Sequence, residues 1–199
     1  VDALRRGDVG RIKQLLDGGI DVNSPMAEPK KGAARPTAPL LYAAKQGHVE
    51  IVRLLLDRGA RIGDALVSTA RDGDIPMLQL LLDRGALVNE ASPTQRMFTT
   101  ETALSVAADR GDVAVLRLLL DRGAAVNLPV EHRDSDWTPV FLAARRGHVS
   151  AIEVLVARGA SVHHTTKSMG AIQGTTPLAV AIASGHRNVA RCLLRRGAD

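Results

Sequence analysis

The heptapeptide Leu-Leu-Leu-Asp-Arg-Gly-Ala occurs three times in this chain, at residues 54–60, 80–86 and 118–124. Looser copies end at Gly19, Gly159 and Gly197, so that six related phrases divide the 199 residues at intervals of 26 to 40 residues. Self-similarity at such a period is typical of repeat architectures, in which each unit packs on its neighbours. The leucines favour a helix with one apolar side, and the glycine favours its end, because glycine readily takes the left-handed conformation.

A second helix signal lies in each interval between these phrases. It begins at Thr-Pro or a remnant of it, where the threonine can cap the free amides and the proline suits the first helical position. It stops at another glycine about eight residues later. We therefore predict inner helices near residues 39–46, 65–72, 103–110, 139–146 and 177–184, and outer helices near 49–58, 75–84, 113–122, 149–158 and 188–196.

These phrases resemble the ankyrin repeat. The resemblance is carried by Thr-Pro-Val-Phe-Leu-Ala-Ala-Arg-Arg-Gly-His at 138–148 and by Leu-Leu-Leu-Asp-Arg-Gly-Ala-Ala-Val-Asn at 118–127, and it covers essentially the whole chain. It implies an all-α repeat solenoid of helix pairs joined by β-hairpin or loop fingers, in a single domain over residues 1–199. The six repeats would span residues 1–23, 24–62, 63–89, 90–127, 128–163 and 164–199.

The connections between repeats vary far more in length than the helices do. From the terminal glycine to the first apolar residue of the next inner helix, four connections span 17 to 21 residues, whereas Gly59 to Leu66 spans 7. Two interpretations are open. Insertions in repeat arrays often lie on the binding face, but loop length costs little stability and drifts easily.

No catalytic constellation is recognisable, because equivalent residues of a repeat array are spread along its axis instead of converging. His48, His148 and His186 occupy one slot in different repeats, and we expect them to form hydrogen bonds to neighbouring loops. The pair His163-His164 has no cysteine or nearby carboxylate to complete a zinc site, so we expect ordinary loop residues. We predict no enzyme activity, no cofactor and no metal.

The single cysteine, Cys192, excludes an internal disulfide. It aligns with Leu54 and Leu118 of the leucine phrase, which predicts a buried, unreactive thiol in the core.

A row of charged residues directly precedes the inner-helix glycines. In the ankyrin repeats that this chain resembles, the corresponding positions line a concave groove, together with the finger tips. The row carries a net charge of +5, which equals the net charge of the whole chain. Two interpretations are open: a solvated polar face, or an electropositive trough that binds an acidic segment through arginine. The positions are Arg5, Arg6, Lys45, Gln46, Arg71, Asp72, Asp109, Arg110, Arg145, Arg146, Ala183 and Ser184.

Large apolar residues in the connections supply a second candidate binding feature. Trp137 precedes Thr138, at the edge of the expected groove, while Met97, Phe98 and Met169 lie within long connections. Such residues are natural anchors for a partner, and tryptophan is enriched in interface hot spots. The alternative is that they pack back on the repeat array.

Composition narrows the class of partner. The basic balance, with a pI near 10, suits an acidic partner, but the chain has only four aromatic rings and none is interleaved with the arginines. We therefore predict a monomeric protein-interaction module with a protein partner. Nucleic-acid or nucleotide binding, or targeting of a longer enzyme or effector, remain the alternatives. No apolar run is long enough to span a membrane, and we expect a cytoplasmic protein or one delivered into another cell.

Overall fold

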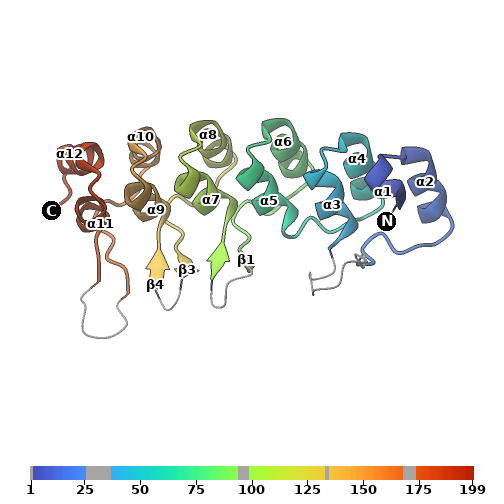
Figure 1. The fold of residues 1–199 in the computed structure, drawn as a ribbon, viewed down its shortest axis with the longest axis horizontal. Coiled ribbons are helices and arrows are strands. Elements are labelled where there is room, and N and C mark those ends of the chain that lie inside the picture. The colour runs from blue at the N-terminus through green and yellow to red at the C-terminus, as the bar shows by residue number, and fades with distance from the viewer. Residues whose placement is uncertain (1, 26–36, 94–98, 133–134, 168–173) are drawn as a thin grey trace. The chain divides into compact units, whose positions relative to one another are not determined.

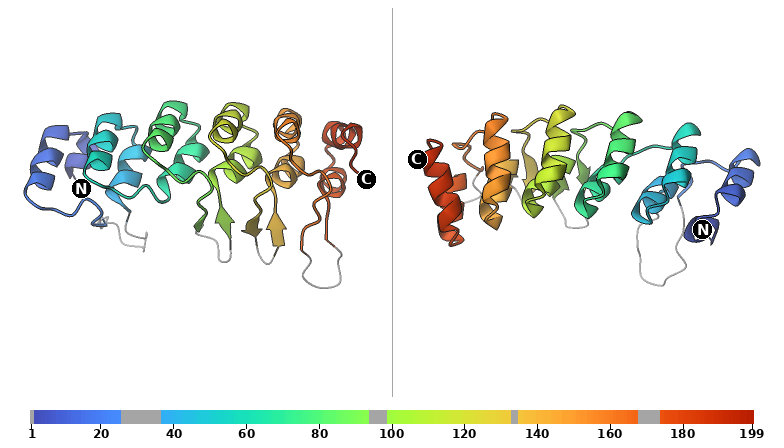
Figure 2. Two further views of the ribbon diagram at one scale, coloured as in Figure 1. Left: turned by 180° about the vertical axis from the view of Figure 1, so that it is seen from behind. Right: turned by 90° about the horizontal axis from the view of Figure 1, so that it is seen from above.

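The computed structural model describes residues 2–25, 37–93, 99–132, 135–167 and 174–199. The chain forms two compact units, residues 1–86 and 87–199, whose elements are drawn in Figures 1 and 2. In its described part, the first unit consists of three helix pairs. These are α1 (Asp2–Arg6) with α2 (Val9–Asp17), α3 (Pro39–Lys45) with α4 (Val49–Asp57), and α5 (Ala65–Asp72) with α6 (Ile75–Asp83).

The described part of the second unit also consists of three helix pairs, and two short hairpins precede the first two of them. The hairpins extend from the inner helices on the side away from the outer helices (Figure 1). The helices are α7 (Ala103–Arg110), α8 (Val113–Asp121), α9 (Pro139–Arg146), α10 (Val149–Ala157), α11 (Pro177–Ala183) and α12 (Arg187–Arg195). The strands are β1 (Ser92–Pro93), β2 (Thr100–Glu101), β3 (Val130–His132) and β4 (Ser135–Trp137).

Both hairpins are antiparallel. Ser92 pairs with Glu101 in the first, and Val130 pairs with Trp137 in the second. The short connection of the third repeat, residues 60–64, contains no strand. The two hairpins thus lie in two of the four long connections.

Capping residues and glycines that were predicted from the sequence begin and end helices in the structure. The Thr138 hydroxyl accepts a hydrogen bond from the amide of Phe141 at the start of α9, and Asp112 caps α8 in the same way. At the other end, Gly111 takes a φ of 71° and Gly147 a φ of 86°, both in the left-handed region. These caps explain why the helices match their predicted ranges to within a residue or two.

The core of each unit lies between its inner and outer helices. In the second unit, Leu116, Leu119, Ile152 and Leu155 of the outer helices are completely buried. They pack against inner helices whose alanines, such as Ala143, are equally buried. Small side chains on the inner helices let successive helices approach closely, which is the reason that an alanine-rich, aromatic-poor chain forms this fold.

Side chains also join each repeat to the next. The Asn127 oxygen accepts a hydrogen bond from the amide of Ser161 at 2.8 Å, and its amide group donates to the carbonyl of Gly159 at 3.0 Å. In the first unit, Asn23 binds the amide of Arg61 and the carbonyl of Gly59 in the same manner. The Val-Asn phrase is thus a clamp between successive repeats.

Candidate partner-binding surface

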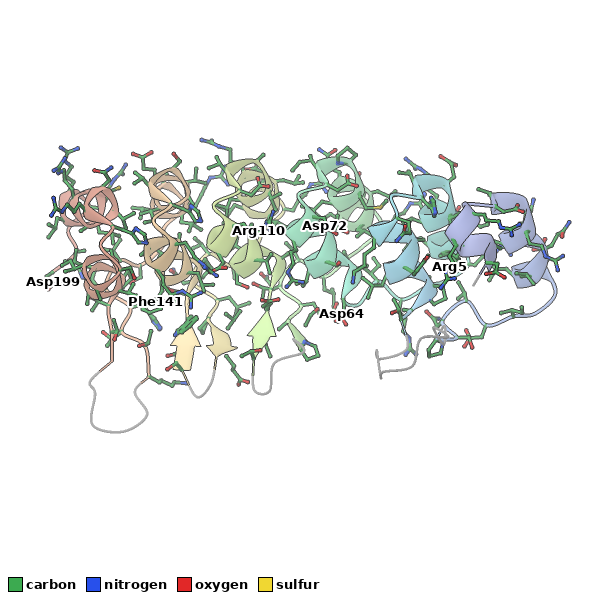
Figure 3. The ribbon with its side chains drawn as sticks, viewed as in Figure 1. Arg5, Asp64, Asp72, Arg110, Phe141 and Asp199 are labelled. Carbon is green, nitrogen blue, oxygen red and sulfur yellow. The ribbon has the colours of Figure 1, made fainter. Side chains whose placement is uncertain are left out.

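The predicted row of charged residues lies at corresponding ends of the inner helices in both units. In the first unit, Arg5 and Arg6 end α1, Lys45 ends α3 with Gln46 as its C-cap, and Arg71 lies in the last turn of α5. All five are exposed. Arg5 and Asp72 are labelled in Figure 3. The predicted register of the row is therefore present in this unit.

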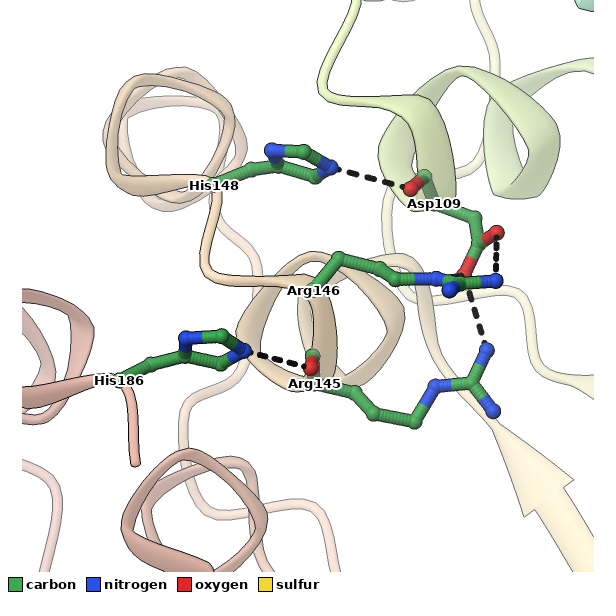
Figure 4. Close-up of polar contacts among 5 residues, drawn as sticks. All are labelled: Asp109, Arg145, Arg146, His148 and His186. Carbon is green, nitrogen blue, oxygen red and sulfur yellow. Dashed lines mark hydrogen bonds and ion pairs between the residues drawn. The ribbon is translucent and has the colours of Figure 1, made fainter. Parts of the chain in front are cut away.

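In the second unit the row is more tightly organised. We call Asp109, Arg110, Trp137, Arg145 and Arg146 the inner-face cluster. Arg110 is the last residue of α7, and Arg145 and Arg146 end α9. Figure 3 labels Arg110, and Figure 4 shows the polar contacts around Asp109.

One carboxylate holds two of these arginines. Nη2 of Arg145 lies 2.9 Å from Oδ1 of Asp109, and Arg146 donates to both oxygens of that carboxylate at 3.0 and 3.1 Å. Burial by itself raises the pKa of Asp109, but the hydrogen bonds from Arg146 and Arg145 outweigh it and hold that pKa below its usual value. Asp109 thus ties Arg145 and Arg146 together.

Trp137 belongs to the same cluster. The guanidinium carbon of Arg145 lies 4.3 Å from the centre of the Trp137 ring, and the Phe141 ring lies 5.5 Å from it on a tilted plane. Although no ring is interleaved with the arginines in the sequence, a cation–π contact joins the two kinds of residue in the fold. Trp137 is half-buried and not a free anchor at the rim.

Arg110 differs from its neighbours. It is exposed, and no carboxylate of the described residues forms an ion pair with it. It follows Asp109 directly in the sequence, and Asp109 forms with Arg145 and Arg146 a pre-oriented group whose summed charge is +1. The cluster as a whole carries a charge of +2 and offers exposed donors from Arg110 and Arg146.

The other predicted anchors, Met97, Phe98 and Met169, lie outside the described residues. Whether Gln46 or any residue of the row contacts a partner stays a prediction. The structure brings together Asp109, Trp137, Arg145 and Arg146. The contact between Asp109 and Arg145 was visible in the alignment of the repeats. Asp109 and Arg145 hold the same slot in adjacent repeats, so opposite charges had to meet.

Two of the three aligned histidines contact the preceding repeat as predicted, but their partners lie at the end of its inner helix and not in a loop. Nε2 of His148 lies 3.1 Å from the carbonyl oxygen of Asp109, and Nε2 of His186 lies 3.0 Å from that of Arg145 (Figure 4). Nε2 of His48, in contrast, is buried and has no hydrogen-bond partner among the described residues. Each of these two histidines is the N-cap of an outer helix, and its ring therefore joins that end to the inner helix of the preceding repeat.

The pair at 163–164 was predicted to have no nearby carboxylate, and this is wrong. Nδ1 of His163 lies 2.8 Å from Asp199, and Nε2 of His164 lies 3.6 Å from Asp136. The two histidines face different carboxylates. Within the part of the chain that the structure describes, no three His, Cys, Asp or Glu side chains are grouped to hold a metal ion.

Cys192 corrects another expectation. It is half-buried on α12 and not in the core. Burial, followed by the charge of Glu153, raises the pKa of the thiol despite the nearby Arg196 and Arg195. The aligned Leu54 is also half-buried, because this position lies at the edge of the outer helix and not at its centre.

Comparison with known proteins gives a consistent result. A family model described as "Ankyrin repeats (3 copies)" matches residues 66–166 and 128–199, and one described as "Ankyrin repeat" matches residues 38–66. Two relatives named "Ankyrin repeat, SAM and basic leucine zipper domain-containing protein 1" match part of this chain. The protein from Oryctolagus cuniculus is 48% identical to it over 58 residues, and the protein from Equus caballus is 46% identical over 59 residues. These segments cover 29% and 30% of this chain, and 11% of each relative.

A solved ankyrin repeat domain from Acinetobacter baumannii AYE matches with a TM-score of 0.76. The match covers 99% of this chain and 96% of that domain at 24% sequence identity, which speaks for the fold alone. Among the described residues, no helix is both long enough and apolar enough to cross a bilayer.

Proposed function

Since the chain belongs to the ankyrin repeat family, whose repeats are generally protein–protein interaction modules, we propose that it binds a protein partner through the ends of its inner helices. The proposed contacts are the row of the first unit, the inner-face cluster and the finger residues Met97, Phe98 and Met169. The observation that carries the proposal is the arrangement at Asp109, which orients Arg145 and Arg146 and is followed in the sequence by the exposed Arg110.

The chemistry of the cluster favours an acidic segment of that partner. Arginine presents paired donors that match the two oxygens of a carboxylate. Arg145 and Arg146 are held in place by Asp109, so less conformational freedom is lost when a ligand binds. Trp137 stacks beneath Arg145 and adds half-buried apolar area at the same place. A partner segment with one or more carboxylates beside an apolar residue fits this surface.

Nucleic-acid binding is the weaker candidate. A stacking platform for bases needs an open aromatic face, and Arg145 covers one face of Trp137 at 4.3 Å. The charge of the cluster is also partly compensated by Asp109. We further infer a binding scaffold without enzyme activity, monomeric and either cytoplasmic or delivered to another cell, and these remain predictions. A targeting role within a longer protein is equally a prediction, because the curated relatives extend far beyond the matched segment.

The test begins with a random peptide library displayed on phage and selected on the immobilised chain. The proposal expects enrichment of sequences rich in Asp and Glu. One enriched peptide is then synthesised, and its dissociation constant is measured for the wild type, for Arg110→Glu and for Arg117→Glu. Arg117 is an exposed arginine of α8, so it controls for the change in net charge.

Arg110→Glu should weaken binding about tenfold or more, which corresponds to about 1.4 kcal/mol, and Arg117→Glu should leave it nearly unchanged. Rising salt should slow association more than it speeds dissociation. Equal binding by wild type and Arg110→Glu, or enrichment of peptides without acidic residues, would refute the proposal. Arg145→Glu is a poorer test, because it places a second carboxylate against Asp109 and disturbs the contact between two repeats.

A further inference from the structure

A regular series of ion pairs runs along the outer helices within each unit. The aspartate that ends one outer helix pairs with the arginine that follows the next one. Asp17 binds Arg58 at 2.8 Å and Asp57 binds Arg84 at 2.8 Å in the first unit, while Asp121 binds Arg158 at 2.7 Å in the second. Each pair joins two neighbouring repeats at the exposed end of the helices.

The series stops at the last repeat of the second unit. The residue that ends α10 is Ala157 where the four preceding outer helices carry aspartate, so Arg196 has no carboxylate in that slot. Arg195 occupies the aspartate slot of its own repeat. The described residues form no ion pair with Arg195 or Arg196. Positions 157 and 195 thus lack the aspartate that ends the four preceding outer helices, and the surface is positively charged where those helices form ion pairs.

The same helix carries further unpaired arginines. Arg187, Arg191 and Arg195 follow each other at four-residue intervals, which in a helix places them on one side with a rise of about 6 Å between them. All three are exposed, and none forms an ion pair within the described residues. Over residues 174–199 the sole carboxylate side chain is that of Asp199, which is bound to His163.

Most of this row works against the stability of α12, although the helix dipole favours Arg195 in the last turn. Like charges four residues apart on a helix repel each other. Arg187 also stands at the first helical position, where the helix dipole disfavours a positive charge. The five other outer helices have an aliphatic residue there, namely Val9, Val49, Ile75, Val113 and Val149. The charge repulsion within the row and the position of Arg187 are therefore not explained by the stability of α12.

A shallow hollow of about 290 Å³ borders the row between α10 and α12. Arg191, Arg195 and Arg196 line it together with Asn188, Cys192, Val149 and Glu153. Three positive charges therefore face one negative charge around the hollow. Because Arg187 and Arg191 lie toward the start of α12, the positive surface extends along the whole outer side of that helix.

We propose that the outer side of α12 is a second binding surface, which takes an acidic helical segment of a partner protein. A helix with carboxylates four residues apart repeats its charges at the same rise of about 6 Å as the arginines. Each pair can form charge-assisted hydrogen bonds. This surface is independent of the inner-face cluster, which lies at the ends of the inner helices.

A protein segment fits better than a nucleic acid. Nucleic-acid binding requires neutralisation of a longer series of phosphates. On the neighbouring outer helices of the same unit, Glu153 is exposed and Arg158 is already paired with Asp121. Arg117 of α8 is a single exposed arginine, whereas a row of three unpaired arginines lies on α12 alone among the outer helices of this unit. That row has about the length of one short helix, which suits a short acidic segment.

The test uses a synthetic alanine-based helical peptide with three glutamates at four-residue intervals. A matched peptide carries the same glutamates at five-residue intervals, which places them on different sides of its helix. Binding to the full chain is followed by fluorescence anisotropy. Cys192 is the one cysteine of the chain and lines the hollow, so its rate of reaction with a disulfide reagent reports on occupancy of this surface.

The first peptide should bind and slow the modification of Cys192, and the second should bind at least tenfold more weakly. The variant with Arg187→Glu and Arg191→Glu should lose at least tenfold in affinity. Arg191→Glu alone should lose several-fold, whereas Arg117→Glu, its counterpart two repeats earlier, should not. Arg110→Glu should also leave this binding unchanged, which separates failure of this proposal from failure of the proposed function.

Three results would overturn the inference. Equal binding of the two peptides would show that the spacing is irrelevant, and unchanged affinity of the Arg187/Arg191 variant would place the contact elsewhere. A single-stranded oligonucleotide that protects Cys192 at lower concentration than the peptide would identify a nucleic-acid surface. Circular dichroism of each variant verifies the fold, and Glu at position 187 is favourable to it because it lies at the helix N-terminus.

Discussion

Replacing Asp109 by Asn tests whether the carboxylate organises the inner-face cluster. The substitution keeps the size of the side chain but removes the charge that Arg145 and Arg146 share at 2.9 and 3.0 Å. The Asp109 and Arg145 side chains are each 29% exposed, and that of Arg146 is 55% exposed. Partial screening by solvent reduces the loss expected for two charge-assisted contacts to about 1–2 kcal/mol in the free energy of unfolding.

The pH dependence follows from the lowered pKa of Asp109. A carboxylate with a folded-state pKa below its unfolded value stabilises the fold at pH values above the unfolded pKa. That stabilisation is lost as the pH falls through the lower folded-state pKa. The difference between wild type and Asp109→Asn should therefore be complete at pH 7, and it should disappear in strong acid, below the usual pKa of 3.8.

The assay is urea unfolding, followed by circular dichroism, once at pH 7 and once in strong acid below the usual pKa of 3.8. Asp121→Asn is the matched control, because it breaks a single, more exposed ion pair with Arg158 and should cost less than about 1 kcal/mol. An Asp109→Asn effect no larger than that of Asp121→Asn would contradict the reasoning. So would an effect that persists unchanged in acid.

Three further predictions concern the repeat array. Leu119→Ala removes a completely buried side chain and should lower the free energy of unfolding by about 2–5 kcal/mol, measured by urea unfolding. Gly111→Ala should destabilise more than Gly123→Ala, because both have positive φ but a Cβ at position 111 would lie 2.5 Å from the His148 ring, whereas position 123 is open; equal melting temperatures would contradict this. If residues 1–199 are one domain, thermal unfolding should show a single transition at every wavelength. Two separated transitions would show instead that the chain consists of two domains.

The helices were predictable because their limits are set by local chemistry. Thr138 caps the next amides, and Gly147 needs a left-handed backbone, and both signals are visible in a single sequence. The alternation of inner and outer helices followed from the repeat itself. That periodicity also located the charged row correctly at the helix ends.

The contacts between repeats were harder to predict, because they depend on how side chains turn after the helices pack. Asp109 was counted as one charge among several, although its alignment with Arg145 indicated a pair. Trp137 was placed at a free edge, but Arg145 and Phe141 both contact it. Alignment alone also placed Cys192 in the core, because it does not distinguish the centre of a helix face from its edge.

The most direct test of the binding role is an NMR titration of the chain with an acidic peptide selected from the library. The side-chain Nε–H signals of Arg110, Arg145 and Arg146 and the indole N–H of Trp137 report on the inner-face cluster. If the inner-face cluster binds the peptide, these signals shift together, to an extent that saturates with the bound fraction. Saturable binding that leaves all four unchanged would contradict it.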